Sequence, residues 1–151
     1  VAGCGQRRRR RVVRAAMTTG RKATGVSAWA LGLLILLPVP MLGSLASGGA
    51  MVAAYGTLSR QGQLAKANAA AARRWGALFL VLSTGLLLLQ LVLGLIRLAA
   101  HTDEASGFFP QGIPITLYVL VCLVHLAVVI AGTLRARRGE VVRLPFMRDT
   151  A

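Results

Sequence analysis

Three long stretches of this 151-residue chain carry no charged side chain, and arginine and lysine collect in the gaps between them. The stretches are residues 23–59, 75–96 and 105–134. Residues 75–96 would form a helix about 33 Å long, which matches a hydrocarbon layer about 30 Å thick. A core helix of a soluble domain would show polar residues every three or four positions, and this segment does not. The sequence therefore predicts an integral membrane protein.

The positive charge predicts how the chain is threaded. Eighteen basic and four acidic residues give a net charge of +14. If each stretch crosses the membrane once, the two sides carry equal numbers of basic residues. If the first stretch enters and returns to the same face, seventeen lie on one side and only Arg97 on the other. Cytoplasmic flanks of membrane helices collect Arg and Lys, so we expect the second arrangement, with both termini cytoplasmic and no nucleic acid as partner.

A proline pair divides the first stretch. Pro38 and Pro40 lack backbone donors, and each disfavours helix at the residue before it. The flanking pieces, residues 27–37 and 41–55, would be helices about 16 and 22 Å long, too short for a full crossing. We therefore predict an all-α bundle: a Pro-broken hairpin over residues 27–55 and full spans over 75–96 and 115–134. Two short membrane helices and a re-entrant hairpin both fit the first block.

The remaining segments are assigned by composition. Residues 1–25 are predicted to be a disordered basic tail, 26–146 a single membrane domain, and 147–151 a C-terminal tail. Residues 59–74 are expected to lie along the inner membrane surface. Basic side chains beside the spans are expected to contact anionic lipid headgroups; these are Arg60, Lys66, Arg73, Arg74, Arg135, Arg137 and Arg138.

Small residues four positions apart predict close helix packing. In lipid, such residues let helix backbones approach, because van der Waals contact replaces the hydrophobic effect. Four sets of residues show this spacing: Gly43/Ser47, Ala46/Ala50/Ala54, Gly49/Ala53 and Ala127/Ala131. We expect these sets to lie at helix–helix contacts.

The sequence contains few side chains that could take part in catalysis or bind a metal or cofactor. None of the four carboxylates, Asp103, Glu104, Glu140 and Asp149, falls in a predicted span, and no phosphate-binding loop or metal-binding helix motif occurs. We therefore predict no catalytic, cofactor-binding or metal site, no cofactor, and no enzyme. The polar residues expected at membrane depth are Ser83, Thr84, Gln90 and His125.

His125 is the one ionisable side chain inside a predicted span. With antiparallel spans it is expected between the levels of Thr84 and Gln90. A neutral imidazole bonded to either would join two helices with about 1 kcal/mol. A gating or proton-sensing role is the alternative.

Two segments resemble a known family. Residues 135–146 read Arg-Ala-Arg-Arg-Gly-Glu-Val-Val-Arg-Leu-Pro-Phe, and residues 68–75 read Asn-Ala-Ala-Ala-Ala-Arg-Arg-Trp. Both resemble motifs of small bacterial membrane proteins with a domain of unknown function, related to the twenty-kilodalton subunit of the chloroplast inner-envelope translocon. The resemblance covers roughly residues 27–146. It implies four helices and cytoplasmic termini, and it supplies no catalytic residues.

The arginine- and alanine-rich composition is typical of a GC-rich bacterial genome, so we expect a multi-pass protein of a bacterial plasma membrane. Its partners would be anionic lipids and a membrane protein or further copies of the chain. The resemblance implies a translocation-related or scaffolding role. The alternatives are an oligomeric pathway for ions or small solutes, and an anchor that binds anionic lipid or nucleic acid through residues 7–14.

Overall fold

The computed structural model describes residues 23–39, 41–100 and 112–143, and within these ranges every regular element is helical. The predictions for residues 1–22, 101–111 and 144–151 lie outside the described residues. The elements, in chain order, are α2 (Val26–Ala30), the 3-10 helix η1 (Leu31–Leu36), α3 (Leu42–Ala53), α4 (Tyr55–Leu58), the 3-10 helix η2 (Ser59–Gln61), α5 (Gln63–Ala99) and α6 (Gly112–Arg137).

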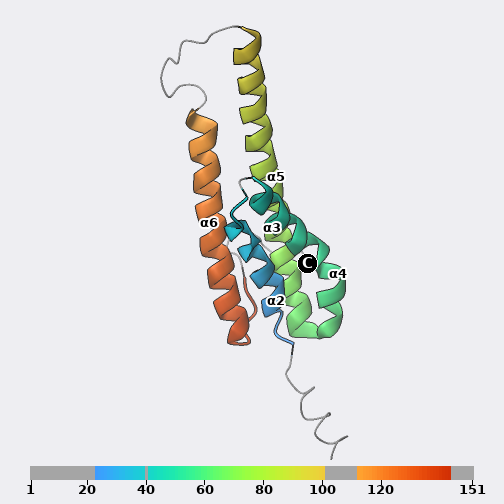
Figure 1. The fold of residues 1–151 in the computed structure, drawn as a ribbon. Coiled ribbons are helices and arrows are strands. Elements are labelled where there is room, and N and C mark those ends of the chain that lie inside the picture. The colour runs from blue at the N-terminus through green and yellow to red at the C-terminus, as the bar shows by residue number, and fades with distance from the viewer. Residues whose placement is uncertain (1–22, 40, 101–111, 144–151) are drawn as a thin grey trace, which may run out of the picture.

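Two of these helices, α5 and α6, are long and apolar enough to cross a membrane. They contain 37 and 26 residues, so they are about 55 and 39 Å long. The two run side by side in opposite directions, and α5 extends beyond the first turn of α6 (Figure 1). The predicted spans over 75–96 and 115–134 are thus confirmed as helices, and both helices continue past the predicted ends.

The prediction that residues 59–74 lie along the membrane surface is wrong for most of that segment. Residues from Gln63 onward form the first three or so turns of the continuous helix α5. One face of these turns is buried, with Ala65, Asn68, Ala69 and Ala72 spaced three or four apart. Because these side chains are small, they allow close packing without giving the segment a strong hydropathy signal. The basic residues of these turns, Lys66, Arg73 and Arg74, are exposed.

The first charge-free stretch forms two short helical segments on either side of a turn. Leu37, which precedes Pro38, has φ −59° and ψ 132°, the extended conformation that a following proline imposes, and η1 ends there. Helix α3 then runs back along η1 (Figure 1). The contact is close, since a Cβ on Gly43 would lie 3.1 Å from the Ile35 carbonyl oxygen. Pro40 lies outside the described residues.

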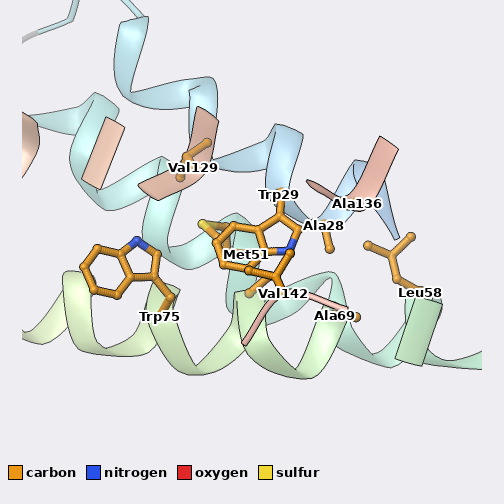
Figure 2. Packing of buried hydrophobic residues seen from close by; sticks show 10 residues of the cluster. Ala28, Trp29, Met51, Leu58, Ala69, Trp75, Val129, Ala136 and Val142 are labelled. Carbon is orange, nitrogen blue, oxygen red and sulfur yellow. The ribbon is translucent and has the colours of Figure 1, made fainter. Parts of the chain in front are cut away.

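The core gathers around Trp29, which is fully buried (Figure 2). Its ring lies against α6 at Gly132, where an added Cβ would come within 2.5 Å of Trp29 Cδ2. Gly32 on η1 meets α6 in the same way, with Val129 Cγ2 only 2.4 Å from where its Cβ would be. Of the predicted small residues, Gly43 and Ser47 are buried, as expected, whereas Ala46, Ala53, Ala127 and Ala131 are exposed. The packing face of α6 instead carries His125, Val129, Gly132 and Ala136.

Candidate functional site

Polar side chains at the centre of the molecule converge on His125, which is fully buried on α6. Three other elements supply the surroundings of its imidazole. Gly32 comes from η1, Ser47 from α3, and Trp75 and Phe79 from α5. Each neighbour reaches the ring because its helix is close-packed there, through the glycines and the serine described above. We call this group the His125 cluster.

Both ring nitrogens of His125 have hydrogen-bond partners. Trp75 Nε1 lies 3.2 Å from Nδ1, and Ser47 Oγ lies 2.9 Å from Nε2. The Gly32 carbonyl oxygen is 3.3 Å from Nε2. It also accepts a hydrogen bond of 2.7 Å from the Ser47 hydroxyl.

The donors and acceptors determine where the imidazole proton sits. The indole N–H of Trp75 can only donate, so Nδ1 accepts and carries no proton. A neutral imidazole then has its proton on Nε2, which donates to Ser47 Oγ, and the hydroxyl donates onward to the Gly32 oxygen. The neutral imidazole with its proton on Nε2 satisfies all of these groups at once.

Aromatic rings enclose the imidazole. The Phe79 ring stacks on His125 with centroids 3.7 Å apart and an interplanar angle of 26°, and the Trp75 ring lies at 6.2 Å and 15°. A groove of about 160 Å³ between α5 and α6 is lined by apolar side chains, including these two rings. The rings contribute both hydrogen bonding and buried apolar area to the contact between α5 and α6.

The close approach of Ser47 and His125 does not form a base-activated nucleophile. A histidine that activates a serine must accept the hydroxyl proton at the nitrogen facing it. Here that nitrogen carries the proton, because Trp75 occupies the other one. In this arrangement the pair joins helices and does not prepare Ser47 for attack.

The predicted partners of His125 were wrong. The ring lies opposite Trp75 and Phe79, about three turns of α5 before the predicted level between Thr84 and Gln90. The prediction aligned the centres of the two apolar stretches, whereas the helices are staggered. Ser83 is buried and its hydroxyl donates to the Leu80 carbonyl oxygen of its own helix at 3.3 Å. Gln90 Oε1 is buried with no hydrogen-bond donor in the described part of the chain.

A second buried polar group, Asn68, joins the two ends of the described chain. Gly139, with φ 77°, lets the chain turn after α6, and the Glu140 N–H bonds back to the Arg135 carbonyl oxygen at 3.2 Å. Asn68 Nδ2 donates to the carbonyl oxygens of Thr24 at 2.8 Å and Glu140 at 3.1 Å. Its Oδ1 accepts from the Val142 N–H at 2.9 Å. The two sequence segments that carry the family resemblance therefore contact each other.

The predicted headgroup contacts are all exposed. They flank two helix ends: Arg60, Lys66, Arg73 and Arg74 lie just before or within the first turns of α5, and Arg135, Arg137 and Arg138 lie at the end of α6. These two ends meet, because Asn68 near the start of α5 binds Glu140 just after α6. The structure thus brings the seven basic residues to one end of the helix pair.

Sequence reasoning missed four partners: Gly32, Ser47, Trp75 and Phe79 around His125. In the sequence, Ser47 stands out for its small size, and Trp75 as the start of a span and the end of a resemblance motif; neither feature indicates a hydrogen bond to His125. Their hydrogen bonds depend on helix stagger, which apolar composition does not report. Among the described residues, no three His, Cys, Asp or Glu side chains form a group that could hold a metal ion.

No protein-family model, curated protein or solved structure matches this chain.

Proposed function

We propose that this chain is a small, non-enzymatic, multi-pass protein of a bacterial plasma membrane that acts as a scaffold through contacts of its helices with other membrane proteins. The observation that carries the proposal is the apolar surface of α5 and α6 beyond the His125 cluster. Large apolar side chains there are 45–74 % exposed; they include Val81, Leu88, Leu91, Leu95, Leu98, Leu117, Leu120 and Leu123. Exposing so continuous an apolar surface to water is unfavourable, whereas lipid or a neighbouring helix can cover it.

The turn between η1 and α3 supports a re-entrant arrangement. Its side chains are apolar and exposed, with Leu36 at 64 % and Leu42 at 61 %. A turn in water normally carries polar residues. Irregular backbone inside a membrane must be covered by protein, and here the turn lies beside α5 and α6 (Figure 1). We place both ends of this hairpin at the cytoplasmic face.

The Asn68 contacts support cytoplasmic placement of both termini. Thr24 near the start of the described chain and Val142 near its end both bond to one side chain. The basic residues around them follow the positive-inside rule. Arg97, at the other end of α5, would then lie outside.

The polar clusters favour a scaffold over an ion or solute pathway. His125, Ser47 and Asn68 make their hydrogen bonds within the protein, where they hold the helices together. The apolar faces of α5 and α6 are the surfaces that remain for partners. A translocation-related role rests on the sequence resemblance alone.

Crosslinking in native membranes tests the scaffold. A photoreactive phenylalanine analogue placed at Leu91 on α5 or at Leu120 on α6 is expected to give a discrete protein adduct, because both side chains are more than half exposed. The same analogue at Lys66, on the basic end of α5, serves as the control and should not give that adduct. The full chain in liposomes should release trapped ions and dye no faster than empty liposomes.

Two outcomes would contradict the scaffold. One is the lack of a discrete adduct from both apolar positions. The other is a flux through liposomes that a Thr84→Val, Gln90→Leu variant abolishes, which would favour the pathway instead.

A further inference from the structure

A pocket on the outer side of α5 has the features of an anion site. It has a volume of about 370 Å³ and is lined by Tyr55, Ala70, Arg73, Arg74 and Ala77. Tyr55 comes from α4 and the other four from consecutive turns of α5. Both arginines are exposed. The alanines keep the floor of the pocket small, which leaves room for a ligand.

Tyr55 helps to position the guanidinium of Arg73. The Cζ atom lies 5.0 Å from the centroid of the Tyr55 ring, a cation–π contact. Such stacking covers the flat face of a guanidinium and leaves its N–H donors at the edge. A planar fork of donors matches two oxygens of a phosphate better than an ammonium group does.

The stagger of α5 and α6 sets the depth of this pocket. Trp75, the residue after Arg74, bonds to His125, and α6 continues through nine further uncharged residues before Arg135. Arg73 and Arg74 therefore lie about 12 Å closer to the middle of the bundle than Arg135, the first charged residue of α6. Basic side chains close to the membrane surface attract anionic lipid headgroups.

The pocket continues into an apolar face of the same helix. Ala77, Val81 and Leu88 follow Arg74 at intervals of three, seven and fourteen residues, so they share its face of α5. Val81 is 71 % and Leu88 55 % exposed. A ligand with an anionic group in the pocket and hydrocarbon chains along this face would match both parts.

We propose that the pocket binds the phosphate of an anionic phospholipid of the inner leaflet, with its acyl chains along Val81 and Leu88. The ligand chemistry is a phosphate ester, and the apolar face selects a lipid over a soluble phosphate. This site rests on the membrane location proposed above.

Native mass spectrometry of the full chain, released from bilayers of phosphatidylcholine mixed with phosphatidylglycerol, measures the preference for the anionic lipid. We expect Arg73→Gln combined with Arg74→Gln to lower the amount of bound phosphatidylglycerol by about tenfold, since both charges act near the headgroup. Arg137→Gln combined with Arg138→Gln removes the same charge from the same end and is the control. We expect a smaller loss there, of about threefold, because these two residues attract anionic lipid to the surface but do not line the pocket.

Soluble competitors identify the source of the phosphate. Inorganic phosphate and glycerol phosphate should not displace the lipid from the unaltered chain; displacement would mean a site for soluble phosphate. Equal losses in the two double variants, or no preference for phosphatidylglycerol in a chain that does insert, would overturn the lipid site. A chain that fails to insert into either bilayer would instead overturn the proposed membrane location, and the lipid site with it.

Discussion

Replacing Gly132 by alanine is expected to destabilise the protein by about 1–3 kcal/mol, because the added methyl group overpacks the core. Its Cβ would lie 2.5 Å from both Cδ2 and Cε3 of Trp29. These atoms belong to a rigid, fully buried ring, so the ring and α6 would have to move apart. Gly32→Ala should act similarly, since its Cβ would meet the branched side chain of Val129 at 2.4 Å. Unfolding of the detergent-solubilised protein by sodium dodecyl sulfate measures the effect.

The matched control is Gly94→Ala in the interior of α5. No atom lies within 4 Å of the Cβ that this change adds. Because alanine favours helix over glycine by up to about 1 kcal/mol, this variant should be as stable as the original or slightly more so. Equal stability of the Gly132 and Gly94 variants would contradict the packing of α6 against Trp29.

Replacing His125 by leucine is expected to cost about 1–3 kcal/mol, because the buried Trp75 N–H loses its acceptor. The stacking of Phe79 on the imidazole is lost as well. Ser47→Ala is the milder control. In that variant Nε2 can still donate to the Gly32 carbonyl oxygen, which lies 3.3 Å away. The same titration with sodium dodecyl sulfate compares the variants.

A double-mutant cycle separates the hydrogen bond from general packing. Trp75→Phe removes the indole N–H, so His125→Leu should cost less in that background than in the original chain. We expect a coupling energy of about 0.6–1.7 kcal/mol, the range of interhelical hydrogen bonds in membranes. Additive effects of the two changes would show that the Trp75–His125 bond does not hold the helices.

The long helices could be predicted from the sequence, whereas their ends and their stagger could not. Uncharged apolar runs of membrane length identified α5 and α6, and Pro38 identified the break after Leu37. The first turns of α5 were missed because alanine and asparagine form its buried face there. Hydropathy measures the apolar content of a segment, whereas close packing of small residues depends on how well the surfaces of two helices fit together.

For the His125 cluster, too, the sequence identified the central residue but not the residues that contact it. His125 stood out because it is ionisable and lies within an apolar stretch. Its partners depend on how far α6 is shifted along α5, and a shift of about three turns exchanges Thr84 and Gln90 for Trp75 and Phe79. Ser47 and Gly32 come from the segments on either side of the proline turn, so only the packing of these segments could reveal them.

In the proposed threading, the first charge-free stretch returns to the face of the membrane from which it enters. Single cysteines at Thr18, Gln61, Arg138 and Ser106, in a background with Cys4 and Cys122 replaced by serine, test this with a membrane-impermeant maleimide. In intact cells we expect only Ser106→Cys to be labelled, and the other three to react after permeabilisation. Labelling of Gln61→Cys but not of Thr18→Cys in intact cells, or the reverse, would place the two ends of this stretch on opposite sides and contradict the account.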